Sequence, residues 1–63
     1  MSRFDLVDIA CTLLRETEKA YHLDCGNAAP VWLPKSQCEV DVDKLGNGTV
    51  TLPEWLAIEK ELI

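Results

Sequence analysis

The residues from Asp43 to Glu54 have much of the spacing of a calcium-binding loop. An EF-hand loop places oxygen ligands at positions 1, 3, 5, 7, 9 and 12, with a glycine at position 6 and a bidentate glutamate at position 12. Counted from Asp43, position 5 is Asn47, position 6 is Gly48 and position 12 is Glu54. The candidate calcium ligands are therefore Asp43, Asn47 and Glu54.

Two features of the same segment argue against calcium. Position 3 is Leu45, which has no side-chain oxygen, and counting from Asp41 instead places Leu45 at position 5 and Leu52 at position 12. An EF-hand also needs a helix before the loop, whereas residues 34–42 alternate apolar and polar side chains. We interpret the Gly-Asn-Gly triplet at 46–48 as a hairpin turn whose glycines supply positive φ angles, and keep a calcium module as an alternative.

Cysteine and histidine could hold zinc or carry out nucleophilic chemistry. The ligand types of a zinc site with three cysteines and one histidine are present in His22, Cys11, Cys25 and Cys38. His22 and Cys25 are three residues apart, which on a strand places them on opposite faces, and no Cys-x-x-Cys pair anchors a site. Buried thiols that act as small hydrophobes are the simpler interpretation. Because nothing marks an orienting acid or an oxyanion hole, we expect no enzyme activity and no cofactor.

The C-terminal residues have the pattern of one helix. Pro53 suits a first helical position, an acid follows it, and apolar residues recur at three- and four-residue spacing. We predict a helix over residues 53–62 that buries Trp55, Ile58 and Leu62.

Short β-prone runs precede this helix. We predict a hairpin of residues 37–42 and 48–52, a strand over 30–33 that the following proline ends or confines to an edge, and a strand over 19–24. Residues 3–15 fit a helix by the spacing of their polar residues and a strand by their β-branched and aromatic content, and we favour the strand. The expected fold is a single α+β domain over residues 1–63, with an antiparallel sheet of three to four strands and one C-terminal helix.

Composition limits the classes of function. The net charge of −5 comes from eleven acids and six bases without a basic patch, which disfavours direct nucleic-acid binding. The chain has no apolar run long enough to cross a bilayer and no signal peptide, so we expect a cytoplasmic protein with no membrane partner. Three widely spaced cysteines fit a reducing compartment. A chain this short buries only about 60% of its unfolded surface, so a homo-oligomer is also expected.

Acidic and aromatic residues are the candidates for contact with a partner. In one interpretation the negative charge serves solubility. In the other, acidic residues that include Glu54 and Glu61 face a basic surface of a protein partner. We expect both tryptophans in the core, although an exposed one would anchor an interface. The candidate partner-binding residues are Glu39, Asp41, Asp43, Trp32 and Trp55.

Three segments together carry a resemblance. They are Thr-Glu-Lys-Ala at 17–20, Val-Trp-Leu-Pro-Lys-Ser-Gln at 31–37, and Val-Thr-Leu-Pro-Glu-Trp-Leu-Ala at 50–57. The pattern resembles very small proteins encoded by bacteriophages and prophages, and it spans residues 17–62. The resemblance implies that the first segment joins two strands, that the second begins a strand and kinks at its proline, and that the third is a strand running into the C-terminal helix. The group brings no established activity and no binding residues.

The resemblance also implies a context, which is a small accessory protein in the cytoplasm of a bacterial host cell. Many such phage products bind and block a host protein, so the expected function is inhibition of a host protein, such as a defence factor, through an acidic and aromatic surface. In a sharper version the acidic face imitates nucleic-acid phosphates. The alternatives are an EF-hand-like calcium or Cys/His zinc module and a self-assembling structural or regulatory phage component.

Overall fold

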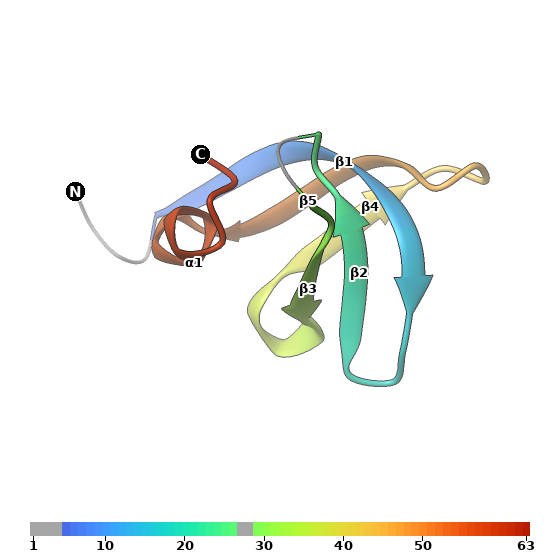
Figure 1. Cartoon of the computed structure of the whole chain (residues 1–63), viewed down its shortest axis with the longest axis horizontal. Helices are drawn as coiled ribbons and strands as arrows, with labels where there is room; N and C mark the ends of the chain where they lie inside the picture. Colours follow the sequence, from blue (N-terminus) through green and yellow to red (C-terminus); the bar gives the residue numbers. More distant parts are fainter. Residues whose placement is uncertain (1–4, 27–28) are drawn as a thin grey trace.

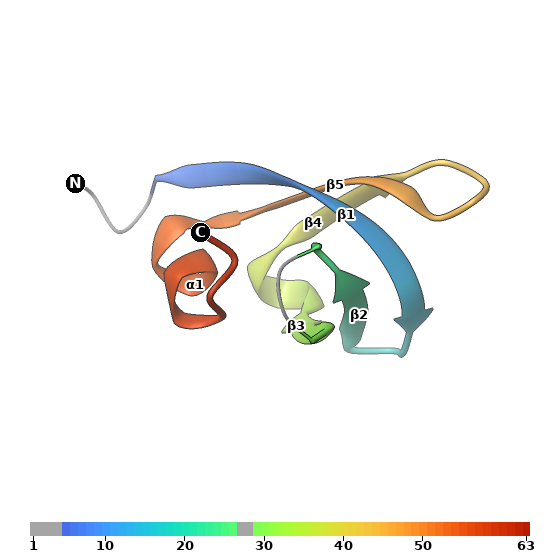
Figure 2. The ribbon, with the colours of Figure 1, turned by 45° about the horizontal axis from the view of Figure 1, so that its top comes forward.

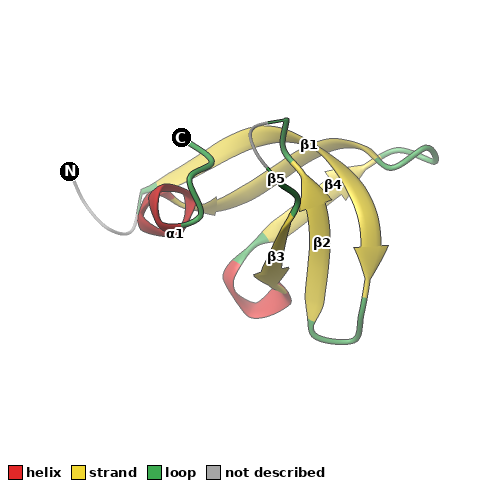
Figure 3. Ribbon diagram, in the orientation of Figure 1, coloured by secondary structure: helices red, strands yellow, loops and turns green. Residues whose placement is uncertain are grey.

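The computed structural model describes residues 5–26 and 29–63, which form an antiparallel sheet and one short α-helix. In chain order the elements are β1 (Leu6–Glu16), β2 (Ala20–Asp24), β3 (Val31–Pro34), β4 (Glu39–Val42), β5 (Asn47–Pro53) and α1 (Glu54–Glu59) (Figure 1). A 3-10 turn, Lys35–Gln37, joins β3 to β4 and is drawn in red together with α1 in Figure 3. The strand order is β3-β2-β1-β5-β4. The α+β class is confirmed, but the sheet has five strands rather than three to four.

The N-terminal segment, which fits either a helix or a strand by sequence, is a strand from Leu6 onwards, while residues 3 and 4 lie outside the described residues. From Leu6 to Cys11 its side chains alternate between exposed and core-facing positions. The register then shifts between Leu13 and Arg15, where a β-bulge inserts one residue. This shift breaks the alternation after Leu13, and the three residues from Leu14 to Glu16 are all exposed.

β1 is the central strand and divides the sheet into two halves. Residues 6–12 pair with β5 and residues 12–16 pair with β2. We call β5, β4 and residues 6–12 the β4 half, and β2, β3 and residues 12–16 the β3 half. A bulge increases the local twist of a strand, and Figure 2 shows β1 curving from one half over to the other. The two halves therefore enclose a core instead of lying flat.

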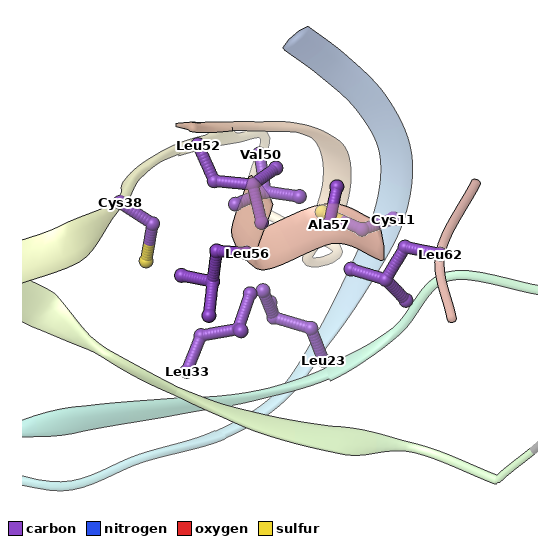
Figure 4. Close-up of a cluster of buried hydrophobic side chains, with 9 residues drawn as sticks. All are labelled: Cys11, Leu23, Leu33, Cys38, Val50, Leu52, Leu56, Ala57 and Leu62. Atoms are coloured by element: carbon purple, nitrogen blue, oxygen red, sulfur yellow. The ribbon is translucent and has the colours of Figure 1, made fainter. Parts of the chain in front are cut away.

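The core joins side chains from both halves and from α1. Leu23 and Leu33 come from the β3 half, Val50 and Leu52 come from the β4 half, and all four are fully buried. Figure 4 shows Leu56 of α1 between these two pairs. Burying each such side chain contributes about 2 kcal/mol, so the short helix is a structural part of the core. The other buried apolar residues of the described chain are Cys11, Cys38, Ala57 and Leu62.

The C-terminal helix is shorter than predicted and buries a different face. Pro53 is the last residue of β5, and the N–H of Glu54 continues the ladder by donating to the carbonyl oxygen of Asp5 at 2.8 Å. Because the helix follows the strand without a loop, Leu56 and Ala57 are the residues turned toward the core. The prediction that Trp55 and Ile58 are buried is wrong: they are 41% and 54% exposed.

Leu62 is buried as predicted, although it lies beyond the helix. Glu61 has a φ of 60°, and the N–H of Leu62 donates to the carbonyl oxygen of Ala57 at 2.8 Å while that of Glu61 donates to Ile58 at 3.0 Å. These bonds form a Schellman motif, which ends a helix and turns the next apolar residue back onto it.

The predicted strands over 19–24 and 30–33 are β2 and β3. β3 lies at an edge of the sheet and ends at Pro34, as a proline in a strand requires. The next residue, Lys35, forms a salt bridge of 2.5 Å with Glu16 and lies 5.0 Å from the centre of the Tyr21 ring. The hydrogen bond to Glu16 raises the pKa of Lys35. These contacts tie the 3-10 turn to the β1–β2 hairpin.

The predicted hairpin of residues 37–42 and 48–52 is confirmed as β4 and β5, although its first strand begins at Glu39 and Gln37 belongs to the 3-10 turn. Its turn uses only one of the two glycines at positive φ: Gly46 has a φ of 87° and donates its N–H to the carbonyl oxygen of Asp43 at 3.1 Å. Gly48 lies inside β5 and serves a different purpose. A Cβ on Gly48 would stand 2.0 Å from the carbonyl oxygen of Asp41 and 2.7 Å from the Cα of Val42. The close approach of β4 and β5 therefore requires glycine at this position.

Gly48→Ala is expected to lower the free energy of unfolding by about 3 kcal/mol, because the added methyl group forces the backbone of β4 away from β5. Gly26→Ala is the control, because a Cβ there meets nothing within 4 Å, and its φ of 80° makes alanine cost only about 1 kcal/mol. Urea denaturation followed by circular dichroism measures both variants. Equal losses of stability would contradict the close approach at Gly48.

Candidate functional site

The three candidate calcium ligands do not form a common site. Asp43 and Asn47 lie at the hairpin turn, whereas Glu54 begins α1 beyond the far end of β5. At the rise of a strand, about 3.3 Å per residue, Asn47 and Glu54 are separated by roughly 20 Å. The Oδ1 atom of Asp43 instead accepts hydrogen bonds from the backbone N–H groups of Leu45, at 2.8 Å, and Asn47, at 3.1 Å. Asp43 therefore holds the turn.

The candidate zinc ligands do not form a common site either, because His22 faces away from the cysteines. Cys11 and Cys38 are buried in the core and Cys25 is half-buried. His22 alternates with the buried Leu23 along β2 and stacks on Trp32, so it faces away from the core. Among the described residues there is no group of three or more His, Cys, Asp or Glu side chains that could hold a metal ion.

The thiols are poor nucleophiles where the structure places them. Burial raises the pKa of Cys11, Cys25 and Cys38 above the ordinary thiol value, and for Cys25 the neighbouring Cys11 and Asp24 raise the pKa further. A raised pKa keeps the thiol protonated at neutral pH, whereas the thiolate is the reactive form. Cys25 lines a shallow hollow of about 390 Å³, and His22 is not among the residues around it. The described residues thus contain no activated Cys–His pair.

The raised pKa values predict a loss of stability in alkali. The contribution of each buried thiol is fully present below its unfolded-state pKa of 9.0 and is lost as the pH rises through the higher folded-state value. We expect the free energy of unfolding to fall between about pH 8 and about pH 10, and to fall less in a Cys11→Ala/Cys38→Ala variant. Urea denaturation at the two pH values tests this. The same fall in both proteins would show that the thiols do not cause it.

Two of the predicted acidic residues share one face of the sheet. Glu39 and Asp41 alternate with the half-buried Val40 and Val42, so their carboxylates stand on the outer side of β4. Asp8 of β1 joins them across β5, since Asp8 lies opposite Thr51 and Thr51 lies opposite Glu39. The hydroxyl of Thr51 donates to Oδ1 of Asp8 at 2.5 Å. We call Asp8, Glu39 and Asp41 the acidic face. Asp8 could not be assigned to this face from the sequence, because its place there depends on the strand order.

The expectation that both tryptophans lie in the core is wrong. Trp32 is 44% exposed because Val31 and Leu33, its neighbours in β3, are the residues turned inward. It stacks on His22 with ring centroids 4.5 Å apart and an angle of 9° between the planes. Arg15 lies opposite His22 on β1, so Arg15, His22 and Trp32 form a row across the β3 half. The alternation of buried and polar residues in β2 and β3 was the signal that could have revealed this row.

Trp55 is also exposed and lies on α1, one helical turn from the exposed Ile58. An apolar pair of this kind is what the expected homo-oligomer could bury. The five candidate partner-binding residues therefore come from separate places. Glu39 and Asp41 belong to the acidic face, Asp43 belongs to the turn, and the two tryptophans belong to β3 and α1.

No family model matches this chain, and no curated protein or solved structure matches it. None of the helices in the described part of the chain is long and apolar enough to cross a membrane.

Proposed function

We propose that this protein is a non-enzymatic binding protein that occupies a surface of a bacterial host protein and blocks it. The observation that carries the proposal is Trp32, a large aromatic side chain held in one orientation on an exposed edge strand. The host context rests on the resemblance of the sequence to small phage-encoded proteins.

The stack on His22 makes Trp32 a suitable anchor for a protein interface. Binding normally costs entropy because exposed side chains lose rotational freedom when a partner immobilises them. The ring of Trp32 already packs face to face on the imidazole of His22. The side chain therefore has less rotational freedom to lose when a partner binds. Tryptophan and arginine are also enriched among residues that dominate binding energy, and Arg15 stands in the same row.

The remaining surface supports binding over catalysis. The described cysteines lie away from His22, and burial keeps their thiols protonated. The acidic face lies on the other half of the sheet from Trp32 and would favour a partner with a basic surface. Binding alone would then block the host protein, because the bound domain excludes any other ligand from the surface that it covers.

The test begins by capturing partners from a bacterial lysate with the tagged protein, with calcium and with a chelator in parallel. The captured host protein is then purified, and its affinity is measured by calorimetry for the wild type, Trp32→Ala and Trp55→Ala. We expect capture under both conditions and a loss of about 30-fold in affinity for Trp32→Ala, because truncating an anchor costs about 2 kcal/mol.

Trp55→Ala is the matched control, since it removes an equally exposed tryptophan from α1. It is expected to change the affinity by less than about threefold. Circular dichroism confirms that both variants are folded. Capture of no stoichiometric protein, or equal affinities for the wild type and Trp32→Ala, would refute the proposal.

A further inference from the structure

β4 is an edge strand whose free backbone groups can be assigned. The N–H of Asp43 donates to the carbonyl oxygen of Asn47 at 3.0 Å, and β4 pairs with β5 in an unbroken antiparallel register. Hydrogen-bonded and non-hydrogen-bonded pairs alternate in such a ladder. Asp41 and Glu39 therefore bond to β5, while the N–H and C=O groups of Val40 and Val42 point away from it. No described strand pairs with this side of β4.

The other edge of the sheet is less suited to pairing. The N–H of Lys35 donates to the carbonyl oxygen of Lys19 at 2.8 Å, so in β3 the groups of Trp32 and Pro34 point outward. Pro34 has no N–H, and its carbonyl oxygen accepts a bond from the thiol of Cys38 at 3.4 Å. β3 is thus blocked at one of its two outward positions, whereas β4 offers two complete residues.

The charges beside the β4 edge select the partner. Glu39 and Asp41 are exposed on the outer face of the sheet, and they precede and follow Val40 in the strand. A second copy pairing through β4 would bring carboxylates next to carboxylates, and like charges on adjacent strands are destabilising. Lysine or arginine at the same places would form opposite-charge pairs. The edge therefore disfavours self-pairing and favours a basic strand.

We propose that the β4 edge binds an extended, basic segment of a protein partner as an added strand. The segment alternates basic and apolar residues. Its basic side chains lie beside Glu39 and Asp41, and its apolar side chains cover the half-buried Val40 and Val42. The inference rests on the proposed function, because it names the chemistry of the host protein that this domain binds.

The probe is a fluorescent eight-residue peptide in which lysine and valine alternate, titrated with the full chain. We expect saturable binding that weakens as salt is raised, since the charge pairs are exposed and therefore screened. Glu39→Gln/Asp41→Asn is expected to weaken binding about tenfold. Glu18→Gln/Glu59→Gln is the matched control, because it removes the same charge from the β1–β2 turn and α1, and it should retain wild-type affinity.

Three further peptides separate strand addition from simple charge attraction. One has the same composition with four lysines followed by four valines. The other two are the alternating peptide with N-methyl groups on every second residue, on the lysines in one peptide and on the valines in the other. We expect at least tenfold weaker binding for the block peptide. We expect the same for the methylated peptide whose methyl groups replace the amide hydrogens that would face β4. Equal affinity for all of these peptides would overturn the inference, and so would an absence of binding by the alternating peptide.

The two proposals fail separately. The first case is that a host protein is captured, Trp32→Ala weakens its binding, and the alternating peptide does not bind. The binding function then stands, and the β4 edge is not a site for a basic strand. If the peptide binds with the expected dependence on sequence and methylation but no host protein is captured, the edge site stands and the host-blocking function fails.

Discussion

The two halves of the sheet are held together through a single strand. β1 pairs with β5 through its first seven residues and with β2 through four of its last five, and Thr12 is the only residue of β1 that is paired on both sides. The bulge after Leu13 bends the strand where the pairing changes sides. This bend brings Leu23 and Leu33 toward Val50 and Leu52, and the space between them is filled by Leu56. The bend therefore lets one sheet bury these side chains between its two halves.

The same arrangement determines what the surface offers. Because β1 is central, the strands formed by the middle of the chain become the two edges of the sheet, and the 3-10 turn Lys35–Gln37 connects one edge to the other. Each edge carries a different chemistry. β3 displays a stacked tryptophan, whereas β4 displays free backbone groups beside two carboxylates. A small domain can thus present two kinds of contact at the two edges of one sheet.

Much of this fold follows from local sequence patterns. Period-two alternation locates β2 to β5, Pro34 ends an edge strand, and the proline at 53 separates strand from helix. The bulge in β1 was harder to foresee, because it lies where the pairing passes from β5 to β2, and that place depends on the strand order. The buried face of α1 also depends on tertiary structure, since a six-residue helix fixed directly to β5 is oriented by the strand rather than by its own periodicity. The tryptophans were misplaced because hydrophobicity alone predicted burial. Alternation with Leu33 in β3 turns Trp32 outward, and the direction in which α1 leaves β5 turns Leu56 inward and Trp55 outward.

The candidate site was only partly predictable. Glu39 and Asp41 share a face because they are two apart in a strand, which the sequence shows, but Asp8 joins them only through the strand order. The calcium-like spacing from Asp43 to Glu54 covers a turn, β5 and the first residue of α1, so the missing ligand at Leu45 and the absence of a helical pattern before the loop were the better guides.

The central claim is that β4 is an open edge, and amide hydrogen exchange of the free protein, measured residue by residue by NMR, tests it most directly. The ladder assigns bonded N–H groups to Asp41 and Asp43 and free ones to Val40 and Val42. The account predicts slow exchange at Asp41 and Asp43 and fast exchange at Val40 and Val42. Slow exchange at all four amides would contradict it, because it would mean that the outer side of β4 is already paired.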